Sequence, residues 1–145
     1  PQYNGKALGV TGSSQGGALS MVTAALDKRV TFYAAIHPAM CDHRAHLQKV
    51  AGGWPHYFYY FPTPTPQRIQ TADYYDMVNF ARRITVPGWF SWGYNDDVCP
   101  PTSTYAAYNS ITAPKELHPY LETGHYWYQE QYEQWSQWLW AQMGL

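Results

Sequence analysis

Charged residues are scarce in this sequence, and neither sign dominates. Only 13% of its 145 residues are Asp, Glu, Lys or Arg, and the formal net charge at pH 7 is −1. Binding to nucleic acid or to an anionic membrane surface needs a clear surplus of basic side chains. The composition therefore predicts neither kind of partner.

The sequence also lacks a long apolar run. No stretch approaches the roughly 18–20 consecutive apolar residues that span a bilayer, and no secretory signal is visible. The chain begins with Pro1 rather than Met, so we expect a processed, cut or fragment chain in which a targeting segment can have been lost. The compartment is left open between the cytoplasm and the periplasm or cell exterior.

Cysteine is rare as well. Two cysteines, Cys41 and Cys99, are too few for a disulfide framework and are not spaced as in a metal knuckle. A free Cys side chain behaves as a small hydrophobe. We expect both thiols to be unpaired and largely buried.

Aromatic residues, in contrast, are abundant. They make up 18% of the chain, with 7 Trp, 14 Tyr and 5 Phe. One interpretation is an aromatic core together with an aromatic surface that joins subunits. The other is a carbohydrate ligand, since aromatic faces stack on sugar rings.

Short apolar segments alternate with helical patterns along one compact domain. Strands are predicted at 7–12, 30–36, 86–93 and 115–121, and helices at 16–27, 68–82, 102–111 and 129–142. Strands that alternate with helices predict an α/β fold, a parallel sheet with helices on both faces. Residues 38–80 hold an aromatic cluster and three prolines, and we expect them to form an excursion over one end of the sheet.

A nucleophile motif lies between the first strand and the first helix. Gly12, Ser13, Ser14, Gln15 and Gly16 match G-x-S-x-G, and a strand before the motif with a helix after it is the setting of a nucleophile elbow. Glycines at both ends leave room for the sharp turn. The pattern predicts Ser14 as a nucleophile beside a helix N-terminus, which favours a developing negative charge.

A serine nucleophile needs a histidine base. The sequence has six histidines: His37, His43, His46, His56, His118 and His125. His118 lies inside the last strand, and the three within 38–80 are expected at the surface or rim. His37 ends the second strand, where it could approach the site. His125 lies in the loop between the last strand and the last helix, and is the predicted base.

The base in turn needs a carboxylate to orient it. In this type of fold the chain order is Ser, then Asp or Glu, then His. Asp96 and Asp97 both follow the third strand, at the sheet edge where α/β folds place their sites. Loop position does not separate them, because either can orient the base while the other caps the turn.

At this point the chain resembles a known family, the acetyl xylan esterases and cephalosporin C deacetylases of carbohydrate esterase family 7. The matching segments are Gly-Val-Thr-Gly-Ser-Ser-Gln-Gly-Gly (9–17), Pro-Ala-Met-Cys-Asp-His-Arg (38–44), residues 74–84, Asp-Asp-Val-Cys-Pro-Pro-Thr-Ser-Thr-Tyr-Ala-Ala-Tyr-Asn-Ser-Ile (96–111), Pro-Lys-Glu-Leu (114–117) and Gly-His (124–125). The resemblance covers nearly the whole chain, and the Cys-Pro-Pro segment is its most specific part.

The resemblance implies a role for particular residues. The family's acid stands three residues before the Cys of Cys-Pro-Pro, which favours Asp96 over Asp97. The nucleophile corresponds to Ser14 and the base to His125. The oxyanion hole uses the backbone N–H of Gln15 and a tyrosine N–H from an earlier loop.

Three aromatic residues are expected to form a substrate rim. Trp54 and Tyr57 belong to the aromatic cluster that we expect to wall the entrance. Tyr126 directly follows the base, where relatives often carry an acidic or small residue.

The resemblance implies a serine esterase that removes acetyl groups from xylan-derived sugars and other small acetyl esters, without a metal or organic cofactor. It also implies that residues 1–145 are the C-terminal portion of an α/β-hydrolase domain, that the missing N-terminal half supplies the second oxyanion donor, and that the protein forms a homo-oligomer. Two alternatives stay open: a non-catalytic or partner-dependent fragment, and an α/β-hydrolase peptidase.

Overall fold

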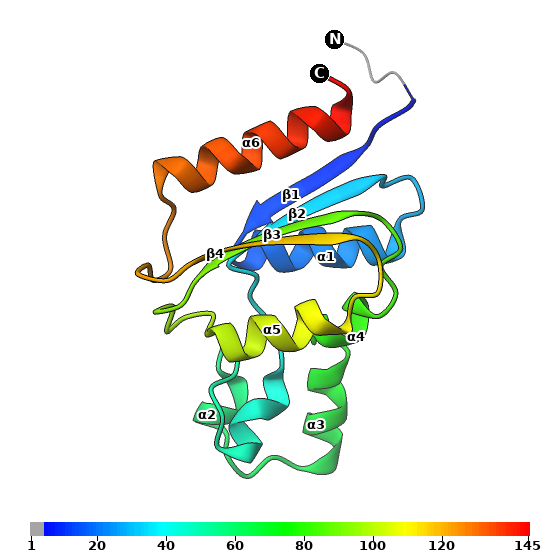
Figure 1. The fold of residues 1–145 in the computed structure, drawn as a ribbon. Coiled ribbons are helices and arrows are strands. Elements are labelled where there is room, and N and C mark those ends of the chain that lie inside the picture. The colour runs from blue at the N-terminus through cyan, green and yellow to red at the C-terminus, as the bar shows by residue number, and fades with distance from the viewer. Residues whose placement is uncertain (1–4) are drawn as a thin grey trace.

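The structure is a computed structural model that describes residues 5–145. Within them, four strands form a parallel sheet whose order follows the sequence (Figure 1). The strands are β1 (Gly9–Ser13), β2 (Phe32–Ile36), β3 (Gly88–Gly93) and β4 (Lys115–Tyr120). All four predicted strands are thus confirmed, with ends that differ by one or two residues.

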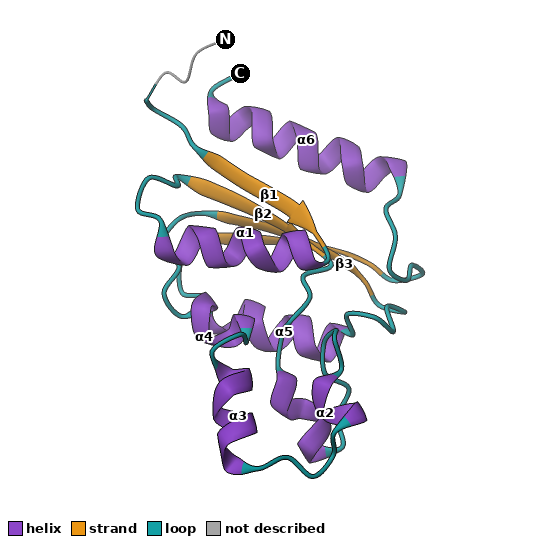
Figure 2. Ribbon diagram, turned by 180° about the vertical axis from the view of Figure 1, so that it is seen from behind, coloured by secondary structure: helices purple, strands orange, loops and turns teal. Residues whose placement is uncertain are grey.

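Helices cover both faces of this sheet, as predicted. Three helices lie on one face: α1 (Gln15–Leu26), α4 (Met77–Ala81) and α5 (Pro101–Ser110). The C-terminal helix α6 (Gln129–Met143) lies on the other face (Figures 1 and 2). Alternate residues of β2 point to opposite faces, so Phe32 joins the core beneath α6 and Tyr33 joins the core beneath α1.

The strand register brings the carboxyl ends of all four strands to one edge. Ser13 at the end of β1 pairs with Ile36 at the end of β2. Ile36 also pairs with Ser91 of β3, which pairs with His118 of β4. Residues that directly follow these strands are therefore neighbours in space although they are far apart in the sequence.

The excursion between β2 and β3 holds short helices. They are the 3₁₀ helix η1 (His43–Gln48), α2 (Tyr57–Tyr60) and α3 (Pro66–Asp73), followed by α4. Its first part passes the carboxyl edge of the sheet, where the N–H of Ala39 donates to the carbonyl of Ser14 at 3.1 Å. Its helices α2 and α3 then project beyond α5, on the side opposite α6 (Figure 1).

The single helix predicted at 68–82 is wrong: α3 and α4 are separate. The break falls at Asp76, which leaves the helical conformation (φ −86°, ψ 125°) and caps α4 by accepting from the N–H of Val78. The same carboxylate accepts from the backbone N–H groups of Asp42 and His43. Asp76 thus ends one helix and ties the excursion together, which the helical pattern of residues 68–82 does not reveal.

Both cysteines are buried and free, as predicted. Many aromatic side chains fill the core, with Trp89, Phe90 and Trp92 of β3 fully buried. Others lie exposed, such as Tyr59 and Tyr74 on the excursion. None of the helices in residues 5–145 has the length and apolar character that crossing a membrane requires.

Candidate active site

Ser14 occupies a tight turn between β1 and α1. Its backbone has φ 56° and ψ −122°, a strained conformation for a residue with a Cβ. A Cβ on Gly12 would lie 2.4 Å from the backbone of Gly16, so the turn requires glycine at position 12. The expectation that Gly16 is required in the same way is wrong, because a Cβ there meets nothing within 4 Å.

Backbone hydrogen bonds hold the turn at the edge of the sheet. The N–H of Ser14 donates to the carbonyl of Ile36 (2.8 Å), and the carbonyl of Ser14 accepts from Ala18 and Ala39 (both 3.1 Å). Gln15 is the first residue of α1. Because N–H groups in the first turn of a helix have no intrahelical acceptor, the N–H of Gln15 is suited to bind an anion beside Ser14.

The loops after β3 and β4 are bound to each other. The N–H of Asn95 donates to the carbonyl of Thr123 at 2.9 Å, and the N–H of Tyr94 donates to the carbonyl of Tyr120 at 2.9 Å. The loops approach so closely that a Cβ on Gly93 would lie 2.2 Å from the carbonyl oxygen of Thr123. This contact brings a carboxylate from one loop against an imidazole from the other.

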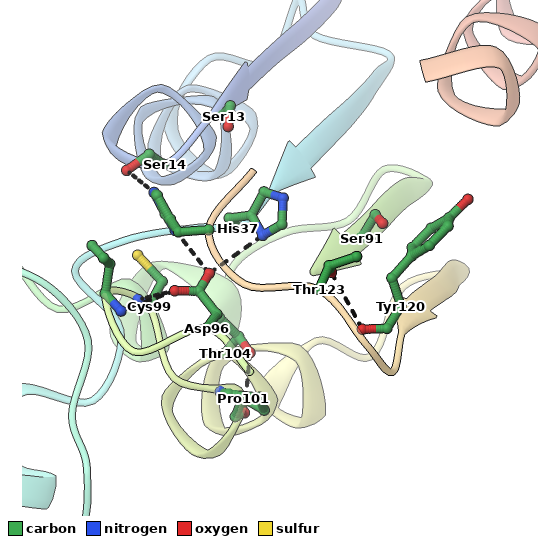
Figure 3. A network of polar contacts seen from close by, with 12 residues as sticks. Ser13, Ser14, His37, Ser91, Asp96, Cys99, Pro101, Thr104, Tyr120 and Thr123 are labelled. Atoms are coloured by element: carbon green, nitrogen blue, oxygen red, sulfur yellow. Dashed lines mark hydrogen bonds and ion pairs between the residues drawn. The ribbon is translucent and has the colours of Figure 1, made fainter. Parts of the chain in front are cut away.

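Ser14, His125 and Asp96 form a continuous hydrogen-bonded line (Figure 3). His125 Nε2 lies 3.0 Å from Ser14 Oγ, and His125 Nδ1 lies 2.7 Å from Asp96 Oδ2. The Asp96 side chain is fully buried, whereas the imidazole of His125 is 24% exposed. The geometry allows His125 to take the Ser14 proton while Asp96 holds its tautomer.

Asp96 is held as a carboxylate by several donors. Its Oδ1 atom accepts from the N–H groups of Val98 (2.9 Å) and Cys99 (2.8 Å). Burial alone raises the pKa of Asp96, but hydrogen bonds from His37, the Cys99 N–H and His125 outweigh it, and the pKa lies below its ordinary value. Asp97, the alternative acid, is exposed and is not among the hydrogen-bond partners of His125.

The other histidines lie in different environments. His37 comes close to Asp96, with Nδ1 3.3 Å from Oδ2. His118 is a half-exposed strand residue stacked on Trp89. His46 and His56 contact each other at 3.4 Å in the excursion. Of the surface or rim position expected for His43, the surface part is wrong because the residue is buried, whereas it does line the cleft described next.

A cleft of about 450 Å³ opens beside the elbow. Gln15 lies at one side of it, and Trp54 and Tyr57 line it from the excursion, together with His43 and Arg68. Tyr126, the third expected rim residue, is exposed and does not line this cleft. Its hydroxyl instead lies 3.2 Å from that of Tyr128.

A buried thiol also lies in this region. Cys99 lies in the loop after β3, close to Asp96 in the sequence, and its side chain is drawn close to that of Asp96 in Figure 3. Burial, with the charge of Asp96, raises the pKa of the Cys99 thiol to about 12. A thiol that stays protonated near neutral pH is a poor nucleophile, which disfavours Cys99 in that role.

Three side chains of the site could hold a metal ion by their spacing. The ligand atoms of His37, Asp96 and His125 lie within 4.8 Å of one another. Those of Asp96 and His125 already share a 2.7 Å hydrogen bond. A metal ligated by His125 Nδ1 would displace the proton of that hydrogen bond, and with it the arrangement that suits proton transfer.

The site includes a residue that the sequence analysis did not identify. Gln131 of α6 is completely buried and reaches His37 and Ser91 beneath the acid. No signal in the sequence marks it, because Gln131 is one of five glutamines in α6.

Comparison with known proteins gives a consistent family. A family model described as acetyl xylan esterase (AXE1) matches residues 1–142. Acetyl esterase Axe7A of Xylanibacter ruminicola is 55% identical over 116 residues, which are 80% of this chain and 26% of that protein. The chain thus spans about a quarter of its curated relative.

Solved structures agree with this family. An acetyl xylan esterase from Paenibacillus sp. R4 is 30% identical with a TM-score of 0.79, over 92% of this chain and 44% of that one. Acetyl xylan esterase 1 from Thermoanaerobacterium sp. JW/SL YS485 is 29% identical with a TM-score of 0.80, over 98% of this chain and 47% of that one. The fold is that of the α/β-hydrolases, and this chain spans less than half of each relative.

Proposed function

The chain belongs to the acetyl xylan esterase (AXE1) family, and we propose that it carries the catalytic residues of a serine esterase that cleaves acetyl esters. Ser14 is the nucleophile, His125 the general base and acid, and Asp96 the carboxylate that orients His125. The observation that carries this proposal is the position of His125, whose two ring nitrogens lie 3.0 Å from Ser14 Oγ and 2.7 Å from Asp96 Oδ2.

The reaction has two halves. His125 accepts the hydroxyl proton as Ser14 Oγ attacks the acetyl carbonyl, and the N–H of Gln15 stabilises the oxyanion. His125 then donates that proton to the leaving sugar oxygen, which leaves an acetyl-enzyme. Water, deprotonated by His125, attacks the acetyl-enzyme and releases acetate and Ser14. Asp96 stabilises the imidazolium in both halves.

The cleft supports an acetylated sugar as substrate. Its volume of about 450 Å³ falls within the range of small-molecule sites. Trp54 and Tyr57 offer aromatic faces on which a sugar ring can stack. We propose acetylated xylan-derived oligosaccharides and other small acetyl esters as substrates, and a homo-oligomer completed by the N-terminal half of the domain as the working form.

Activity on nitrophenyl esters tests the proposal. In the longest natural chain that contains this sequence, we expect p-nitrophenyl acetate to be hydrolysed and Ser14→Ala to abolish that hydrolysis. Ser13→Ala is the matched control: within residues 5–145 its hydroxyl accepts from Trp127 Nε1 at 3.1 Å and contacts no member of the proposed triad through a hydrogen bond, so the variant should retain most activity. Hydrolysis that survives Ser14→Ala would rule out Ser14 as the nucleophile.

The same assay separates the alternatives. A preference for long acyl chains or for a peptide anilide over the acetyl ester would favour a lipase-like enzyme or a peptidase. A folded protein without activity on any of these substrates would favour the non-catalytic fragment.

A further inference from the structure

His37 stands at the carboxyl end of β2, in a conformation that is unusual for a residue with a side chain. Its φ is 43°, in the left-handed region, which costs such a residue free energy and persists only where the surroundings hold it. Its N–H donates to the carbonyl of Ser91 at 2.8 Å, and its side chain is only 1% exposed. A buried imidazole on a strained backbone, directly beside Asp96 and His125, calls for a functional explanation.

The ring touches two titratable side chains, Asp96 and His125. Its Nδ1 lies 3.3 Å from Asp96 Oδ2, the same oxygen that accepts a hydrogen bond from His125 Nδ1 (Figure 3). The two imidazoles lie 5.3 Å apart between centroids. Nδ1 makes no well-aligned hydrogen bond within residues 5–145, Asp96 included, and the Asp96 carboxylate, at ion-pair distance, is the acceptor that the structure offers to a proton there.

Helix α6 fixes which ring nitrogen of His37 carries the proton. The amide oxygen of Gln131 accepts from the N–H of Tyr128 (3.4 Å), so its Nε2 faces inwards. There Gln131 Nε2 donates to Ser91 Oγ (2.7 Å) and lies 3.5 Å from His37 Nε2. The Ser91 hydroxyl donates its own proton to the carbonyl of His118 (2.6 Å). His37 Nε2 therefore faces a donor, and the His37 proton belongs on Nδ1, towards Asp96.

His37 is not placed to act as the base itself. Its Nε2 faces Gln131, whereas the ring nitrogen that faces Ser14 belongs to His125. With 1% of its side chain exposed, it also has no access to a substrate. Within residues 5–145, the polar group that connects His37 to the proposed chemistry is Asp96.

We propose that His37 is a positioning residue: a second imidazole, oriented by Gln131 of α6, that donates to Asp96 Oδ2 and fixes the carboxylate for His125. Two backbone N–H groups already hold Oδ1, and His37 supplies the corresponding restraint on Oδ2. The catalytic line then has four members, one after each of the four parallel strands. This inference rests on the proposed esterase function.

Substitution of His37 in the longest natural chain that contains this sequence tests the inference. We expect His37→Leu to lower kcat for p-nitrophenyl acetate about 10- to 100-fold with KM unchanged, because a hydrogen bond to a charged group is lost. A carboxylate with one donor fewer accepts more strongly from His125 and favours the protonated imidazole, which is the form that the acid limb of the kcat/KM profile reports. The acid limb of the kcat/KM profile should therefore move to higher pH. His37→Asn, whose amide N–H can replace Nδ1–H, should recover most of both effects.

A second variant separates positioning from folding. Gln131→Met removes the donor that sets the His37 tautomer, and should change kcat and the acid limb in the same direction but less. If Gln131 acts through His37, the double variant should be no slower than His37→Leu alone. His118→Leu changes a side chain of β4 that stacks on Trp89 outside the cluster, keeps the backbone carbonyl, and should leave the pH profile unchanged.

Two outcomes would overturn the inference. One is a folded His37→Leu protein with unaltered kcat and pH profile while Ser14→Ala is inactive, in which case the esterase proposal stands and only this one fails. The other is an equal loss in His37→Asn and His37→Leu, which would mean that the ring only fills space. If Ser14→Ala is as active as the unaltered chain, the proposed function itself fails.

Discussion

A single carboxylate, Asp96, is central to the proposed chemistry at the residue scale. The Asp96 side chain is buried, yet hydrogen bonds from His37, the Cys99 N–H and His125 keep its pKa below the ordinary value. In the proposed mechanism, an ionised acid opposite His125 stabilises the imidazolium that forms when Ser14 is deprotonated. The low pKa of Asp96 is thus part of how the site is prepared before substrate arrives.

Asp96 and its neighbour Asp97 offer a direct comparison. Asp96→Asn keeps the shape of the acid but replaces an acceptor of the His125 proton with a donor, and we expect kcat to fall on the order of 10,000-fold. Asp97→Asn alters an exposed carboxylate in the same loop and should leave kcat within about twofold. Steady-state kinetics on p-nitrophenyl acetate, with circular dichroism to verify folding, measures both. Equal losses in the two variants would contradict the assignment of the acid.

The limits of prediction at this scale are physical. The G-x-S-x-G pattern and the position of His125 after the last strand follow from local sequence order. The choice between Asp96 and Asp97 does not, since it depends on which side chain turns inwards; only the resemblance favoured Asp96. The contact between His37 and Asp96 depends on a left-handed backbone at the end of β2, for which a non-glycine residue gives no signal.

At the scale of elements, the site depends on two loops that meet at the sheet edge. The acid loop follows β3 and the base loop follows β4, and backbone hydrogen bonds join them. Gly93 lets them approach, because its α-carbon faces the backbone of Thr123. The separation of Asp96 from His125 is therefore set by a residue that takes no part in the chemistry.

Two glycines test that dependence. Gly93→Ala would place a Cβ 2.2 Å from a backbone oxygen of Thr123, so the loops must move apart. We expect a loss of about 1–3 kcal/mol in the free energy of unfolding and a fall in kcat of at least tenfold. Gly124→Ala is the matched control from the other loop, since its nearest neighbour would lie at 3.5 Å. Urea unfolding and kcat should stay close to those of the unaltered protein in that variant, and a harmless Gly93→Ala would refute the role of the contact.

The same scale shows where periodicity fails. The four strands and helices α1, α5 and α6 repeat their apolar pattern and were predictable within about two residues. The helices of the excursion were not predictable in this way. The carboxylate of Asp76 accepts hydrogen bonds from the backbone N–H groups of Asp42 and His43, which are far away in the sequence, and Asp76 separates one helix from the next. A long-range cap of this kind leaves no trace in a local apolar pattern.

At the scale of the whole molecule, α6 links stability to the site. Trp135, Trp138 and Leu139 of α6 pack against the sheet. The same helix contributes Gln131 to the buried polar chain beneath Asp96. Loss of α6 packing should therefore disturb catalysis as well as stability.

Two tryptophans of α6 separate these effects. Trp138 is buried, meets Phe32 edge to face at 5.9 Å, and donates from Nε1 to Glu116 Oε1 at 2.9 Å. We expect Trp138→Ala to lower the free energy of unfolding by about 3–5 kcal/mol, because it leaves a cavity between α6 and the sheet. Trp140→Ala removes a side chain of the same size that is 56% exposed, and should change stability by about 0.5 kcal/mol or less. Urea unfolding followed by circular dichroism measures both. Equal stability of the two variants would mean that α6 does not hold this face of the sheet. A destabilised Trp138→Ala protein with unaltered kcat would mean that the packing of α6 does not influence the site.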